Sequence, residues 1–114
     1  MLTELASEVE EGNVEYKLLI NPSNEDRLEQ LATQMQWRIE EGEGHAIYYI
    51  GVRDNGIQRG IGGKTLECSF KTMRVLCNKV GATMKVLSRK KGEEDGTFVV
   101  EILVQQLKFK DNFI

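Results

Sequence analysis

The stretch that most constrains the fold is an apolar run near the C-terminal end, TFVVEILVQQL, which covers residues 97–107. In an extended chain, side chains alternate between two faces. Here Val99 and Leu103 add apolar surface to the second face. A strand that is apolar on both faces is typically covered on both sides. The run therefore predicts a central strand with other strands beside it.

Periodicity and turn signals elsewhere predict two helices and four further strands. Ser23 is the expected N-cap of the first helix, with Asp26 at the capping-box position. Asn55-Gly56 is a strong hairpin signal and predicts that the segments on either side of it pair as strands. The predicted strands are residues 14–20, 46–52, 57–61, a segment after Gly81, and 97–107. The first predicted helix ends near Glu41, and the second spans about residues 65–79.

This order, β-α-β-β-α-β-β, predicts an α+β fold with a mixed five-stranded sheet and two helices on one face, like a ferredoxin plait with an extra strand. Such a sheet would leave its other face free for a partner. We expect residues 14–107 to form a single domain, residues 1–13 to be an acidic, flexible lead, and residues 108–114 to be a tail.

Length and composition indicate a small soluble domain. The chain has 114 residues, of which 40% are hydrophobic, and no apolar run approaches the ~20 residues of a membrane helix. The acidic N-terminus lacks the basic and apolar regions of a signal peptide, so we expect a cytoplasmic protein. Cys68 and Cys77 fall in one predicted helix, about 13 Å apart along its axis. That separation predicts two free thiols, with Cys68 the more exposed.

The glycine-rich stretch RGIGGKT, residues 59–65, invites comparison with a phosphate-binding loop. That loop needs a glycine five positions before the one that precedes lysine, and the residue there is Gln58. Asn78-Lys79-Val80-Gly81 has Gly81 where a guanine-reading loop has aspartate. The stretch therefore predicts a flexible connection into a helix rather than a nucleotide site.

Residues for catalysis or metal binding are not grouped in this sequence. His45 is the single histidine, and the two cysteines do not have zinc spacing. No H-E-x-x-H or G-x-S-x-G motif occurs. We expect no catalytic, cofactor-binding or metal site, and no enzyme activity from this chain itself.

Charge is distributed unevenly along the chain. Residues 1–44 carry eleven acids and three bases, whereas residues 45–92 carry ten bases and two acids. On the second predicted helix, Leu66, Phe70 and Met73 form an apolar seam. Lys64, Lys71 and Arg74 lie on the side away from it. They are candidate contacts for RNA phosphates, although a solvated helix face has the same pattern.

Trp37 lies about 180° around the first predicted helix from its apolar stripe. A tryptophan in this position is either covered by the N-terminal residues or presented to a partner. Trp37 is therefore a candidate partner contact.

Three stretches resemble one protein family: EYKLLINPS, RLEQLATQMQWRIEEGEGHAIYYIGVRDNG and KTMRVLCNKVGATMKVL. They are similar to the segment before the GTPase core in the GTP-binding protein 1 family of eukaryotic, elongation-factor-Tu-like translational GTPases. The resemblance covers about residues 15–104 and is most specific over residues 33–56. It implies GTP hydrolysis, work on transfer RNA or ribosomes, and links to messenger RNA decay. No catalytic residue is carried over, because the GTPase core would begin after Ile114.

Two functions are therefore compatible with the sequence. The chain is expected to be either a domain of a larger protein or a stand-alone relative without GTPase activity. In the first hypothesis it is a non-catalytic accessory domain that binds its GTPase core or another protein. In the second it is a small RNA- or ribosome-binding module that uses the basic face of the second helix.

Overall fold

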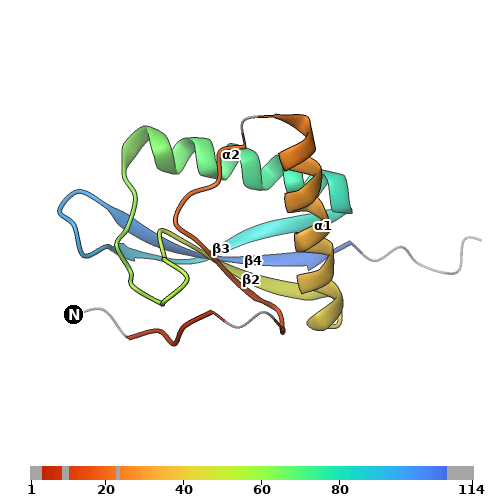
Figure 1. Ribbon diagram of the computed structural model, residues 1–114, viewed down its shortest axis with the longest axis horizontal. Coiled ribbons are helices and arrows are strands. Elements are labelled where there is room, and N and C mark those ends of the chain that lie inside the picture. Colours follow the sequence, from red (N-terminus) through yellow and green to blue (C-terminus); the bar gives the residue numbers. More distant parts are fainter. Residues whose placement is uncertain (1–3, 9–10, 23, 108–114) are drawn as a thin grey trace, which may run out of the picture.

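The computed structural model describes residues 4–8, 11–22 and 24–107. Four strands form one mixed sheet in the order β1-β2-β4-β3, with two helices between strands in the chain (Figure 1). Strands β1 and β2 are parallel, and the other two pairs are antiparallel. The elements are β1 (Val14–Lys17), α1 (Glu25–Glu41), β2 (His45–Ile50), α2 (Gly63–Val80), β3 (Ala82–Lys91) and β4 (Phe98–Gln106).

Strand β4 is an interior strand of the sheet, as the apolar run predicted. It pairs with β2 on one side and with β3 on the other. Parallel strands need a crossover connection, and α1 is the crossover between β1 and β2. Strands β3 and β4 form a hairpin, so β1 and β3 are the two edges of the sheet.

The predicted five-stranded sheet is wrong, because residues 57–61 do not form a strand. The turn at Asn55-Gly56 does form, and Arg53 N–H donates to Ile57 O at 2.9 Å. Gly60 N–H also donates to Gly51 O at 2.8 Å, but no extended ladder forms, because Gly51 and Gly60 adopt left-handed φ values of 92° and 86°. Ile61 makes an isolated bridge to Phe98 instead.

The expected likeness to a ferredoxin plait fails for the same reason. The order among the described residues is β-α-β-α-β-β, not β-α-β-β-α-β-β. The hairpin that a plait carries between its helices lies after α2 in this chain. The expectation of an α+β fold with a mixed sheet and two helices is confirmed.

Both helices pack on one face of the sheet and enclose the main core (Figure 1). Helix α1 contributes Leu31, Met35 and Ile39, and α2 contributes Met73 and Leu76. Strands β2 and β4 supply the core residues below them: Ala46, Tyr48, Ile50, Val100, Ile102 and Val104. Apolar residues recur about every 3.6 positions along the helices and every second position along the strands. These are the spacings of a helix and a strand that each bury one face.

A second, smaller core lies on the other face of the sheet. Tyr16, Val52 and Val99 are buried there, with Leu5 packed against them. The Tyr16 hydroxyl donates to Ala6 O at 2.7 Å. Residues 4–8 therefore cover part of the face that the sequence left open, and in Figure 1 they lie below the strands, on the side away from α2.

The helix ends and cysteines fit local sequence signals. Asn24 caps α1, since its Oδ1 accepts from Arg27 N–H at 2.8 Å; the expected cap, Ser23, lies outside the described residues. Cys68 is exposed and Cys77 is buried, and both are free thiols, as predicted.

Neither helix in the described ranges has the length and apolar character needed to cross a membrane. The predicted tail, residues 108–114, also lies outside the described residues.

Candidate functional site

The outer side of α1 presents a large aromatic side chain to solvent. Trp37 is 65% exposed, whereas Met35 and Ile39 on the inner side are almost fully buried. Exposure of this much of an indole ring is costly because the ring is largely apolar. Trp37 therefore marks a surface where a partner could be bound.

A groove of about 930 Å³ runs along α1 beside Trp37. One wall is the outer side of the helix, and the other is formed by residues that precede β1. The volume lies within the range of small-ligand and peptide pockets. The lining residues are Glu8, Glu11, Gly12, Gln30, Thr33, Gln34, Trp37, Arg38, Glu40 and Glu41.

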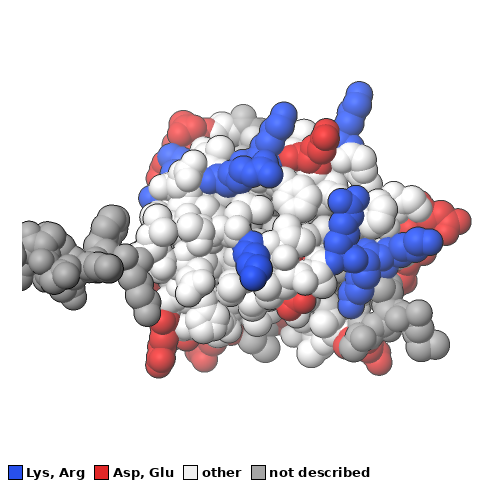
Figure 2. Space-filling view, turned by 180° about the vertical axis from the view of Figure 1, so that it is seen from behind, with Lys and Arg blue, Asp and Glu red and all other residues white. Residues whose placement is uncertain are grey.

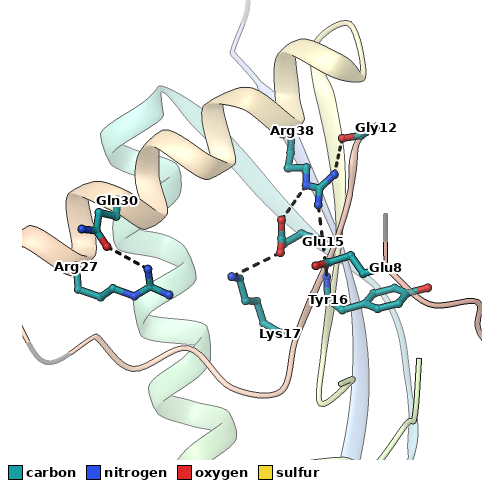
Figure 3. A network of polar contacts seen from close by, with 8 residues as sticks. All are labelled: Glu8, Gly12, Glu15, Tyr16, Lys17, Arg27, Gln30 and Arg38. Carbon is teal, nitrogen blue, oxygen red and sulfur yellow. Dashed lines mark hydrogen bonds and ion pairs between the residues drawn. The ribbon is translucent and has the colours of Figure 1, made fainter. Parts of the chain in front are cut away.

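Arg38, which lines this groove, also forms a buried ion pair that joins α1 to β1 (Figure 3). Arg38 Nε donates to Glu15 Oε1 at 2.7 Å, and Arg38 Nη1 donates to Gly12 O at 2.8 Å. Arg38 is 6% exposed and Glu15 is 1% exposed. The second Glu15 oxygen lies 3.5 Å from Lys17 Nζ. The buried carboxylate is thus paired on both sides, which is the condition for keeping a charge inside a protein.

Glu8 connects the N-terminal residues to the same network. Its carboxylate accepts a hydrogen bond from Tyr16 N–H and lies 4.0 Å from Arg38 Nη2. Burial, together with the neighbouring Glu15 carboxyl, raises the pKa of Glu8 to about 7, although the Tyr16 N–H and Arg38 act against the shift. The Glu8 carboxyl group therefore gains or loses a proton near neutral pH. The same group joins residues 4–8 to β1 through Tyr16 N–H.

Gln34 offers an unused acceptor at this groove. Its Oε1 is buried and has no hydrogen-bond partner among the described residues. A buried carbonyl oxygen without a donor costs about 1–3 kcal/mol. A donor supplied by a bound partner would remove that cost.

This arrangement has the features of a binding site. No group of three or more His, Cys, Asp or Glu side chains with metal-binding geometry occurs in the described part of the chain. His45 is exposed on β2, away from both cysteines in the sequence. The groove instead combines an aromatic ring, carboxylates and amides, which are groups that recognise a polar or charged peptide.

The predicted basic contacts lie on a different helix from Trp37. Lys64, Lys71 and Arg74 are all exposed on the outer side of α2, and Glu67 lies among them at helical spacing. Helix α2 contacts β3, whose exposed bases are Lys85, Arg89 and Lys91. Figure 2 shows Lys and Arg side chains spread over this side of the molecule.

Two other bases from the basic part of the chain, residues 45–92, are already paired with carboxylates. Arg59 Nε lies 3.2 Å from Glu94 Oε1. Lys79 Nζ lies 2.6 Å from Glu29 Oε1 and 3.7 Å from Glu25 on α1. The carboxylate of Glu29 raises the pKa of Lys79. These two residues hold elements together and contribute little free charge to a nucleic-acid surface.

The glycine-rich stretch packs against the β3–β4 hairpin. Gly60 N–H donates to Gly51 O, and Ile61 N–H donates to Phe98 O. A phosphate-binding loop needs its backbone N–H groups directed at the ligand. In this stretch the N–H groups of Gly60 and Ile61 donate to backbone oxygens of the fold. Gln58, which stands where a phosphate-binding loop needs glycine, is 3% exposed.

The Glu15–Arg38 pair was not predicted from the sequence, although a signal was present. Arg38 falls on the apolar stripe of α1, next to Ile39 and one turn from Met35. Glu15 lies between apolar residues in β1. An isolated base on one buried face and an isolated acid on the facing element indicate a buried ion pair.

Curated proteins with similar sequences connect this domain to GTP-binding proteins. The chain is 41% identical to GTP-binding protein 2 of Homo sapiens and of Mus musculus, over 96% of the chain and 19% of each relative. It is 29% identical to GTP-binding protein 1 of Xenopus laevis, over 85% of the chain and 14% of that protein. The resemblance predicted from the sequence is confirmed, and the chain spans about a fifth or less of these relatives.

A viral relative carries the domain in a shorter protein. The chain is 30% identical to uncharacterized protein R625 of Acanthamoeba polyphaga mimivirus, over 89% of the chain and 54% of that protein. No family model and no solved structure matches the chain.

Proposed function

We propose that this chain, which is homologous to a domain-sized part of GTP-binding protein 2, is a non-catalytic accessory domain that binds a protein partner. The observation that carries the proposal is the match to only 19% of GTP-binding protein 2, which leaves most of that protein to supply GTP binding. The groove beside Trp37 is the surface we assign to the partner, either the GTPase core or another protein.

The structure of the glycine-rich stretch supports a role without nucleotide. Phosphate recognition by such a loop depends on free backbone N–H groups. Gly60 donates its N–H to Gly51 O, just after β2, and Ile61 donates its N–H to Phe98 O in β4. Gly60 also has no room for a side chain, since an added Cβ would lie 2.3 Å from Thr97 Oγ1. Close packing explains the glycine at this position without any ligand.

Calorimetric titration with GTP and magnesium tests this proposal. We expect no specific binding by the 114-residue chain. A dissociation constant below about 10 µM, which corresponds to roughly −7 kcal/mol, would contradict an accessory role without nucleotide. ATP titrated under the same conditions is the control for weak, general phosphate binding.

A second candidate function is RNA binding through Lys64, Lys71 and Arg74. The observation that favours it is their common exposure on the outer side of α2. Phosphate contacts release counterions, so binding would weaken steeply with salt. Glu67 lies among these bases, and its negative charge weakens their attraction to RNA phosphates.

Binding of transfer RNA at two salt concentrations separates the two functions. If the basic side binds RNA, Lys71→Glu with Arg74→Glu abolishes binding. A control with the same charge change, Arg27→Glu with Arg53→Glu, retains most of it. Exposed substitutions usually change stability by about 0.5 kcal/mol or less, so both variants should fold. Absence of binding by the unmodified chain at low salt would reject the RNA candidate.

A further inference from the structure

We propose that the groove beside Trp37 binds an arginine-containing segment of the partner, with one guanidinium group stacked on the Trp37 ring. This inference rests on the proposed protein-binding role and specifies the chemistry of the segment that is bound. It follows from the charge of the groove, from the position of the carboxylates around the ring, and from the free acceptor of Gln34.

The groove carries carboxylates without a matching number of free bases. Glu11, Glu40 and Glu41 line it and are exposed. Arg38 is the base among the described lining residues, and its guanidinium is engaged by Glu15 and Gly12. The surface that a partner meets is therefore acidic and favours a basic segment.

Helical spacing places two of these carboxylates next to the aromatic ring. Glu40 and Glu41 follow Trp37 by three and four positions on α1, and residues at these spacings are neighbours on a helix surface. A cation over an indole ring is attracted by the π system. A cation above Trp37 would also lie within reach of the Glu40 and Glu41 carboxylates.

Arginine fits this site better than lysine does. A guanidinium is planar, stacks on aromatic rings and donates five hydrogen bonds in a fixed fork, whereas an ammonium is a compact and strongly hydrated charge. The groove offers such a fork the carboxylate acceptors of Glu40 and Glu41, and Gln34, which lies three positions before Trp37, has a buried Oε1 that is unpaired among the described residues. The volume of about 930 Å³ accommodates a short segment rather than a single side chain.

Fluorescence of Trp37 tests this proposal directly, because it is the single tryptophan of the chain. The probe is a seven-residue peptide of alternating glycine and arginine, added to the full chain at low salt. The matched probe has citrulline, which is neutral and nearly the same shape, in place of each arginine. We expect a saturable change in Trp37 emission with the arginine peptide and at least about tenfold weaker binding of the citrulline peptide.

Two double variants with the same change in net charge locate the binding site. Glu40→Gln with Glu41→Gln should weaken binding of the arginine peptide at least about tenfold. Glu67→Gln with Glu93→Gln, whose residues lie outside the groove, should leave it within about twofold. Trp37→Phe, measured by calorimetry, should also weaken binding, because phenylalanine is a poorer partner for a cation.

Several results would overturn the proposal. Equal binding of the arginine and citrulline peptides would show that charge does not matter, and equal loss in both double variants would show that the groove is not the site. Absence of a saturable response to the arginine peptide, with circular dichroism confirming the fold, would also overturn it. Because no nucleotide is present, this outcome is distinct from GTP binding by the chain, which would contradict the proposed accessory role.

Discussion

At the scale of single residues, Glu8 is the group whose chemistry changes near neutral pH. It contacts Tyr16 N–H and Arg38 at the same time, so it links residues 4–8 to both β1 and α1. Burial and the nearby Glu15 raise its pKa to about 7 from an ordinary value of 4.5. A carboxyl group with a raised pKa in the folded state makes stability depend on pH.

Stability should therefore fall as pH rises from about 4.5 to about 7. In this window the unfolded chain has lost the Glu8 proton while the folded chain still holds it, so deprotonation favours unfolding. Below the window, Glu8 is protonated in both states, so its contribution to stability is fully present and no longer changes with pH. Glu8→Gln, which imitates the protonated carboxyl, should remove this component of the pH dependence.

Urea unfolding at pH 5 and pH 8 measures the effect. The difference in the free energy of unfolding between these pH values should be smaller for Glu8→Gln than for the unmodified chain. Glu11→Gln, at an exposed position, is the control and should behave like the unmodified chain. An identical pH dependence in the Glu8 variant would show that this carboxyl is not held in the network.

At the scale of elements, the Glu15–Arg38 pair joins α1 to β1 across the edge of the sheet. Strand β1 has four residues and forms ladder hydrogen bonds with β2 on one side only. A short edge strand has little ladder energy to hold it, so side-chain contacts to the helix above it matter more. Leu31, Met35 and Ile39 fix α1 over the sheet, and Arg38 fixes its position relative to β1.

Replacing Arg38 with methionine should destabilise the fold by about 3 kcal/mol, because Glu15 is then a buried charge that has lost its main partner. Replacing both residues, with Glu15→Leu and Arg38→Met, should recover much of that loss, since apolar residues of similar volume can replace a buried pair. Urea unfolding of the unmodified chain, of the single variants Arg38→Met and Glu15→Leu, and of the double variant gives the coupling energy. A double variant as unstable as the sum of the two single variants would mean that the residues do not interact.

The elements also show what the sequence could and could not predict. The interior strand β4 and the buried seam of α2 were predicted, because Val99, Leu103 and Met73 follow regular periods. The strand at residues 57–61 was wrong, since the left-handed φ of Gly51 and Gly60 depends on packing against Thr97 and Phe98. Those contacts join segments far apart in the chain, so no local pattern reveals them.

The groove beside Trp37 was only partly predictable for a similar reason. The exposed position of Trp37 follows from helical spacing alone. The opposite wall, with Glu8, Glu11 and Gly12, depends on how residues before β1 fold back along α1. The sequence predicts an exposed ring, whereas the shape of the site requires the tertiary structure.

At the scale of the whole molecule, the uneven charge of the sequence becomes an uneven charge in space. The acidic first part of the chain forms β1 and α1, and the basic part forms α2 and β3. Because β1 and β3 are opposite edges of the sheet, acids and bases gather on different sides. Figure 2 shows the basic side, and the groove beside Trp37 belongs to the acidic side.

In the proposed accessory role, this domain supplies a partner-binding surface to a larger GTP-binding protein, whereas the nucleotide site lies elsewhere in that protein. The most direct measurement is the GTP affinity of human GTP-binding protein 2 with and without the segment homologous to this chain. We predict that the shortened protein binds GTP within about threefold of the whole protein. Loss of GTP binding by a shortened protein that remains folded would contradict the claim.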